Sequence, residues 1–251
     1  WRVLAEDAMR AVMAFDRTVE AIESFPARPN IGVLVGIDGG RLRHHLGDAI
    51  REDRAAGRPL YQLLDDLVGA SLVAPWAWSR WTPEWRRRYF PADEEQARLL
   101  RKKRMEGVCT GFRPGSSAFD DVWGRDQSCH PVGELSHPDD EAGWHALPTP
   151  APQASLRRAR RMDAWLDGIL RLEAHFQDSA LTPDGTRVAV HEYTLHADAD
   201  PETLELLDVH ADPRILPNPE CPEAVDNIAR LVGSPLPRLR ALALTELRGV
   251  L

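Results

Sequence analysis

Four side chains in the last third of the chain are of types that carry out chemistry in proteins: Asp178, His191, Glu192 and Cys221. Aspartate, histidine and cysteine are common ligands of zinc and iron, so we expect Asp178, His191 and Cys221 to hold such a divalent metal. The same residues could act without a metal, with His191 as general base, Asp178 or Glu192 orienting it, and Cys221 as nucleophile. In the plainer alternative, His191 is bonded to a neighbouring carboxylate and Cys221 is a core residue.

The spacing of two of these residues limits what they can do together. His191 and Glu192 are adjacent within 187–196, which has the pattern of a β-strand. Neighbouring side chains of a strand point to opposite faces of its sheet. We therefore expect that His191 and Glu192 do not serve the same site directly.

A second candidate lies in the middle of the chain, where residues 109–152 are rich in Gly, Pro, Asp and His. The glycines, serines and arginine of 111–117 could surround an anion, although they match neither a Walker loop nor a dinucleotide-binding fingerprint. The alternative is a loop packed over a junction. The other candidate residues of this segment lack the paired spacing of a structural zinc site: Cys109, Cys129, His130, His137 and His145.

Aromatic residues crowd the span 76–90. Such density is typical of a buried junction or of a surface that docks another subunit, and an apolar small-molecule pocket is a further alternative. The residues are Trp76, Trp78, Trp81, Trp85, Tyr89 and Phe90.

The elements that would position these residues occur as two similar copies. The strand-like segments that begin at Arg2 and Thr18 have counterparts 185 positions later, at Arg187 and Thr203. Each pair of segments is separated by a polar break and predicts a β-hairpin. At this offset, Glu6 and Asp7 of the first copy correspond to His191 and Glu192, so one copy would be active and the other structural.

After the hairpin the offset becomes 197, because the second copy has about a dozen extra residues. The triplets at 34–36 and 41–43 recur at 231–233 and 238–240. Gly36 and Gly233 fit the positive φ that favours glycine where a helix ends. We expect a second helix at 41–54 and another from Leu239 onwards.

These patterns predict an α+β fold that is pseudo-duplicated, each unit being an antiparallel β-meander followed by helices. The first repeat unit, with its Trp-rich and helical extension, is expected at 1–105, a central loop and Pro-rich linker at 106–154, and the second unit at 155–251. Four strands are expected in the second unit, at 160–166, 169–176, 187–196 and 203–209. The first residue is not methionine, and we expect the natural chain to extend beyond both ends.

Composition narrows the class of protein. The 251 residues are 43% hydrophobic and 28% charged, which is typical of a globular chain, and the net charge of −8 disfavours nucleic-acid binding. No apolar run is long enough to cross a membrane, and no signal peptide is visible. Three cysteines at wide spacing argue against a disulfide framework and fit a reducing cytoplasm.

Short stretches of the second unit match a pattern known from other proteins, and they lie at 176–179, 191–193, 214–217, 220–222, 231–233 and 246–249. On these residues the second unit resembles DUF2889, a bacterial domain family of unknown function, over about 157–251. The family has no established activity, so the resemblance sharpens the expected fold and the choice of residues but not the chemistry.

Two functions of different class follow from the sequence. In the first, the protein is an enzyme that acts on a small organic molecule, with or without a metal ion, at a site in the second unit. In the second, it is a non-catalytic accessory subunit that docks through the Trp-rich segment. A homo-oligomer or a complex with a partner protein is expected in either case.

Overall fold

The computed structural model describes residues 2–81, 84, 93–120, 130–136, 139, 153–247 and 249–250. It forms two compact units, Trp1–Ala77 and Trp78–Leu251. The helical extension and the central segment therefore fall in the second unit. None of the helices in the described ranges is long and apolar enough to cross a membrane.

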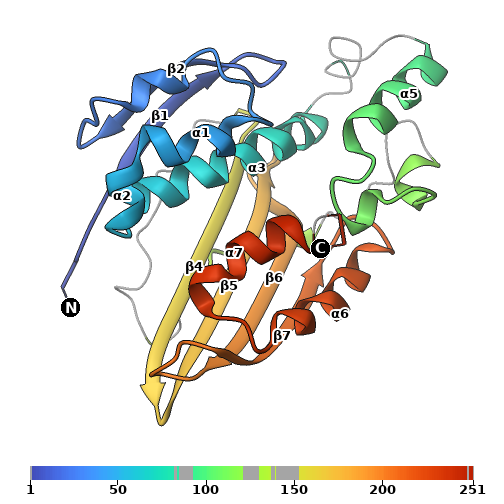
Figure 1. The fold of residues 1–251 in the computed structure, drawn as a ribbon. Helices are drawn as coiled ribbons and strands as arrows, with labels where there is room; N and C mark the ends of the chain where they lie inside the picture. The colour runs from blue at the N-terminus through green and yellow to red at the C-terminus, as the bar shows by residue number, and fades with distance from the viewer. Residues whose placement is uncertain are drawn as a thin grey trace. The chain divides into compact units, whose positions relative to one another are not determined.

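The first unit is a β-hairpin with helices (Figure 1). Strands β1 (Ala8–Met13) and β2 (Val19–Phe25) are antiparallel. They are followed by the short helix η1 (Ile31–Leu34) and by α1 (Leu42–Ala49), α2 (Arg51–Ala55) and α3 (Pro59–Ser79), the last of which runs past the unit boundary. The core consists of apolar side chains that these elements turn inward: Val19, Ile31, Leu34, Leu42, Leu46, Ala49, Ile50, Leu60, Leu64 and Val68.

The second unit is built on a long antiparallel meander (Figure 1). Its strands are β4 (Leu156–Asp167), β5 (Ile169–Leu181), β6 (Arg187–Ala199) and β7 (Leu206–Ile215). The short strand β3 (His130–Pro131) pairs with β6 beyond the end of β7. All four strands predicted from alternation are present, and each is longer than predicted.

Helices precede and follow the strands of this sheet along the chain. Before it come α5 (Glu94–Met105), η2 (Thr110–Phe112) and η3 (Ser117–Phe119). After it come η4 (Cys221–Ala224), α6 (Val225–Ile228), η5 (Ala229–Leu231) and α7 (Leu236–Thr245). Helix α7 begins before the predicted Leu239 because proline is accepted in the first turn of a helix. The mixture of antiparallel sheets and helices confirms the α+β class.

The two units share a backbone pattern at the end of their hairpins. In the first, Val19 N–H donates to Ile37 O, Gly36 N–H to Val19 O, and Gly39 N–H to Arg17 O. In the second, Leu206 N–H donates to Ser234 O, Gly233 N–H to Leu206 O, and Leu236 N–H to Leu204 O. The positive φ angles also recur, at Arg17 and Leu204 and at Gly36 and Gly233.

These hydrogen bonds, together with the β-bulges of the two hairpins, bear on the predicted alignment of the two copies. After the hairpin, Gly36 and Gly233 hold equivalent places in the two sets of hydrogen bonds and lie 197 positions apart. Within the hairpin, however, the bulge at Val12/Met13 matches the one at Asp198/Ala199, which gives an offset of 186. Alignment on this bulge would pair Glu6 with Glu192 rather than with His191. Short strands with similar alternation allow such slips in an alignment, whereas a bulge fixes the register.

The units differ in the size of their sheets. The described part of the first unit contains the hairpin β1–β2, and the second contains the meander with β3. The sheet residues of β4 and β5 therefore have no counterparts in the described part of the first unit.

Gly36 has a positive φ angle, and replacing it tests whether this backbone conformation requires glycine. Gly36→Ala should lower the free energy of unfolding by about 1–2 kcal/mol, because a β-carbon is unfavourable at a φ of 83°. Gly32→Ala is the matched control, since neither position has an atom within 4 Å of a built β-carbon and Gly32 lacks a positive φ. Urea denaturation followed by circular dichroism measures both, and equal losses would contradict this explanation.

Candidate functional site

A row of polar side chains crosses three strands of the second unit. The strand register places Arg158 of β4 opposite Asp178 of β5, and Asp178 opposite His191 of β6. Arg158 donates two hydrogen bonds to the Asp178 carboxylate, at 2.8 and 2.6 Å, and Nδ1 of His191 lies 3.1 Å from Asp178 Oδ2. We call this side of the sheet the Asp178 face. Two of the four predicted site residues, Asp178 and His191, are thus in contact.

The Asp178 carboxylate is ionised although it has no exposed surface. Burial by itself raises the pKa of Asp178, but the hydrogen bonds and charges of Arg158 and His191 outweigh it, and the pKa is lowered. An ionised Asp178 orients the His191 ring as the aspartate of a catalytic triad does. The contact is also what the plainer alternative expects, a histidine bonded to a neighbouring carboxylate.

Cys221 lies at the start of η4, outside the three strands that carry that row. Its sulfur would be 2.5 Å from a β-carbon on Gly111, and the sulfur of Cys109 would be 3.9 Å from the same point. Burial raises the pKa of both thiols, which keeps them protonated and makes them poor nucleophiles. The structure therefore does not gather Asp178, His191 and Cys221 into one ligand set.

The central glycine-rich segment is held by carboxylates of the chain itself. Arg113 makes a two-pronged ion pair with Glu223, and both the amide and the hydroxyl of Ser117 donate to Glu220. The groups that could have surrounded a free anion thus bind the acids at η4. The segment packs as a structural loop in its described part; Cys129, His137 and His145 lie outside the described residues.

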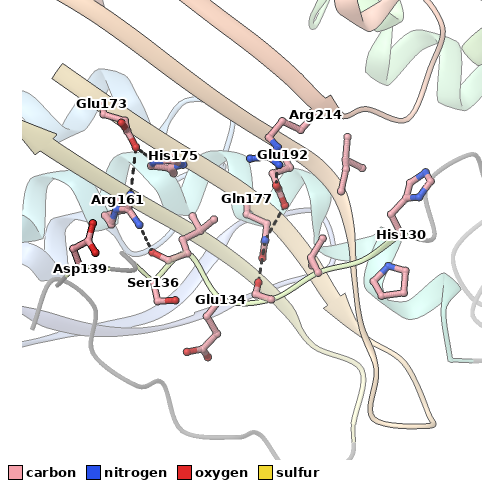
Figure 2. A pocket seen from close by; sticks show the side chains of 15 residues that line it. His130, Glu134, Ser136, Asp139, Arg161, Glu173, His175, Gln177, Glu192 and Arg214 are labelled. Carbon is pink, nitrogen blue, oxygen red and sulfur yellow. Dashed lines mark hydrogen bonds and ion pairs between the residues drawn. The ribbon is translucent and has the colours of Figure 1, made fainter. Parts of the chain in front are cut away.

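The opposite side of the sheet, which we call the cavity face, borders a cavity of about 690 Å³. Residues 130–136 form a strap that begins at β6 and crosses below β5 towards β4, as Figure 2 shows. Glu192 lines this cavity, whereas His191 and Asp178 do not. His191 and Glu192 thus lie on opposite faces of the sheet, as the alternation of a strand predicts. The polar lining side chains are His130, Glu134, Ser136, Asp139, Arg161, Glu173, His175, Gln177, Glu192 and Arg214.

One end of the cavity carries an acid–base cluster. His175 Nε2 lies 2.6 Å from Glu173 Oε1, and its Nδ1 lies 3.4 Å from the Thr194 hydroxyl. The mostly buried Arg161 donates to Asp163 at 2.8 Å and to Leu135 O at 3.0 Å. Its guanidinium also lies 3.5 Å from Glu173, so positive charge already faces both acids.

The other end is organised around Gln177, whose residue is 2% exposed. Its side-chain amide donates to Gly133 O of the strap and to Glu192. Arg214 lies 3.5 Å from the other Glu192 oxygen, and its side chain is 54% exposed. The strap and three strands are therefore joined by one polar network, and Arg214 keeps a solvent-facing cation beside it (Figure 2).

One group of the described residues has the spacing of a metal site. Ligand atoms of Asp163, Glu173 and His175 all lie within 4.8 Å of one another. A divalent ion there would compete with Arg161 for both carboxylates. This set shares no member with the predicted ligands Asp178, His191 and Cys221.

A comparison with protein families finds a match for the part of the chain that contains the sheet β4–β7 and the helices after it. The family model described as "Protein of unknown function (DUF2889)" matches residues 156–251. Residues 156–251 belong to the DUF2889 family. No curated protein matches the chain, and no solved structure matches it.

The DUF2889 segment contributes seven of the fifteen residues that line the cavity, and the sequence analysis selected only Glu192 of these as a candidate site residue. The sequence does carry a signal for the cavity lining, because polar residues alternate along two strands. They are Glu173, His175 and Gln177 on β5, and Glu192, Thr194 and His196 on β6. Alternation on successive antiparallel strands predicts one polar sheet face. The strap could not be placed in this way, because two residues of β3 are too few to show a pattern.

The buried row of the DUF2889 sheet makes stability depend on pH. Asp178→Asn should lower the free energy of unfolding at neutral pH by about 3–5 kcal/mol, because Arg158 loses its buried counter-charge. The folded pKa of Asp178 is lowered, so its contribution is complete above the unfolded value and is lost as pH falls through the folded one. Thermal and urea unfolding over a pH series should therefore show the two proteins converging in acid.

Asp208→Asn is the matched control for this change, since Asp208 is an exposed residue of β7. It should alter stability by less than about 0.5 kcal/mol. A loss for Asp178→Asn that does not diminish on acidification would contradict the ionised state of Asp178.

The contact between Gly111 and Cys221 can be tested by a double-mutant cycle. Gly111→Ala should cost about 1–3 kcal/mol of unfolding free energy, because its β-carbon would meet the Cys221 sulfur at 2.5 Å. Adding Cys221→Ala should recover part of that loss by making room. Strictly additive effects in urea denaturation would show that the two residues do not constrain each other.

Proposed function

We propose that the second unit is an enzyme domain that binds a small polar organic molecule in the cavity and acts on it by acid–base chemistry. The observation that carries this proposal is the convergence of polar side chains from β4, β5, β6, β7 and the strap on one cavity. Small-molecule sites have volumes of about 300–1,000 Å³, and the cavity falls within that range.

The lining favours a polar ligand with both hydrogen-bond donors and acceptors. Arg214 and the exposed His130 can donate to such a molecule, and Glu192 and Asp139 can accept from it. Apolar contacts from Val132, Leu135 and Ile215 would hold its carbon skeleton. A wholly apolar ligand would displace water from these polar groups without replacing its hydrogen bonds, which is costly.

His175 and Glu173 are the proposed proton-transfer groups. They are in mutual hydrogen-bond contact on the cavity wall, the arrangement in which a carboxylate orients a histidine for general acid–base catalysis. Arg161 supplies fixed positive charge beside them. The metal-assisted version of the proposal would use Asp163, Glu173 and His175, with Arg161 displaced.

We also infer that the chain is pseudo-duplicated and that one copy carries the site. The recurring hydrogen bonds, bulge and positive φ angles support duplication. Glu192 has a counterpart in Glu6, but Arg161, His175 and Gln177 lie on the strands that have none in the described part of the first unit. A site that needs Arg161, His175 and Gln177 would belong to the second copy.

The accessory-subunit alternative relies on the segment Trp76–Phe90. Trp81 already donates its indole N–H to Leu181 O at the end of β5. This contact supports a packing role for Trp81 within the second unit rather than a free docking role. Trp85, Tyr89 and Phe90 lie outside the described residues.

Ligand binding at the cavity can be tested with a panel of amino acids, sugars and hydroxy acids by saturation-transfer NMR on the full chain. Compounds that bind should lose at least about tenfold in affinity on Arg214→Ala, because a hydrogen bond to a charged group contributes about 1.5–3 kcal/mol. His175→Ala should abolish turnover of such a compound while leaving its binding measurable.

His210→Ala is the matched control, an exposed histidine of β7 that does not line the cavity. It should leave binding unchanged. The proposal fails if no compound of the panel binds, or if binding survives Arg214→Ala at full strength.

A further inference from the structure

Two histidines on neighbouring strands of the second unit lie directly opposite each other. The register pairs His196 of β6 with His210 of β7, and alternation along β6 puts both on the cavity face with Glu192. The side chain of His196 is 54% exposed, His210 is exposed, and neither lines the cavity. Opposite residues have their β-carbons about 4.5–5.5 Å apart, so both imidazole rings can reach one point above the sheet.

A carboxylate extends this pair to a third strand. The register places Glu173 of β5 opposite His196, on the side away from β7. The two carboxylate oxygens have different neighbours: Oε1 lies 2.6 Å from His175 Nε2 and 3.5 Å from the Arg161 guanidinium. Oε2 lies 3.7 Å from His196 Nδ1, which is too long for a direct hydrogen bond. Glu173 can therefore offer Oε2 to a ligand beside His196 while Oε1 keeps its contacts.

The surface around the two histidines is rich in negative charge. Along β7, Asp208 and Asp212 lie two residues before and after the histidine, and along β6 Asp198 lies two residues after it. Asp198 is opposite Asp208, and like charges in that arrangement repel each other. Arg171 lies opposite Asp198 from the other side and balances one of these charges. The surroundings thus favour a bound cation over an anion.

We propose that Glu173, His196 and His210 bind one divalent transition-metal ion of the zinc class. Two imidazoles and one carboxylate are an established ligand set for zinc and for iron, and water would complete the coordination. As the side chains stand, the three ligand atoms are not all within 4.8 Å of one another. Closing the site requires rotation of exposed imidazole rings, which is fast at a protein surface. Metal binding here does not require that the cavity accept a small molecule.

This set differs from the neighbouring one that shares Glu173. Asp163, Glu173 and His175 are closer together, but Arg161 lies 2.8 Å from Asp163 and 3.5 Å from Glu173. A metal ion there would have to displace that arginine. Binding through Oε2 of Glu173 and the two exposed histidines leaves the arginine and its ion pairs in place.

Calorimetric titration of the full chain with zinc chloride tests the site, and one ion per chain is expected. Glu173→Gln, His196→Ala and His210→Ala should each weaken zinc binding at least about tenfold, because residues that merely support a metal ligand already contribute about 10–100-fold. His44→Ala is the matched control, an exposed histidine of α1, and should leave the affinity unchanged. Calcium should not compete, since it prefers sites made of oxygen ligands.

Asp163→Asn separates the two overlapping sets and should leave zinc affinity unchanged. Circular dichroism of the histidine variants should match wild type, because both side chains are exposed. The proposal is overturned if zinc does not bind, if any of the three ligand variants keeps full affinity, or if calcium competes equally. A loss of zinc on Asp163→Asn but not on His210→Ala would also overturn it, by assigning the ion to the neighbouring set.

Discussion

The buried ion pair between Arg158 and Asp178 is the constraint on which the second unit depends. A carboxylate with no exposed surface must be paired, and Arg158 and His191 provide its partners from the two neighbouring strands. Such a pair contributes little net stability, but any strand register that separates Arg158 from Asp178 would leave a buried charge without its partner, which is strongly unfavourable. A slip of one residue would bring the side chains of the other sheet face opposite Asp178. The register of β4, β5 and β6 is therefore set by this row.

That register decides where the remaining polar residues lie. With Arg158, Asp178 and His191 on one face, the alternate residues Arg161, His175 and Glu192 must lie on the other. The strap then covers them and is bonded through Gly133 to Gln177 and through Leu135 to Arg161. The cavity thus follows from a contact on the opposite side of the sheet.

The loop before the sheet and the helix after it are held by an equally specific arrangement. Gly111 packs against Cys221 so closely that no larger residue fits without movement. Glu220 and Glu223 satisfy the donors of Ser117 and Arg113. These contacts give Cys221 and the glycine-rich segment structural roles.

The sequence by itself determined the local features of this protein. Alternation located the four long strands, the repeated triplets located Gly36 and Gly233, and the neighbouring positions of His191 and Glu192 placed them on opposite faces. These features depend on residues close together in the chain, for which propensity and period are sufficient. Only the tertiary structure decided which of the candidate residues meet. It brought His191 into contact with Asp178 but did not bring Cys221 within metal-ligand spacing of the two, because strand register and the bulge at Asp178/Ser179 are set by contacts between distant residues. It also brought the strap beneath the sheet and so created the cavity, which depends on contacts such as the hydrogen bond from Gln177 to Gly133, 44 residues apart.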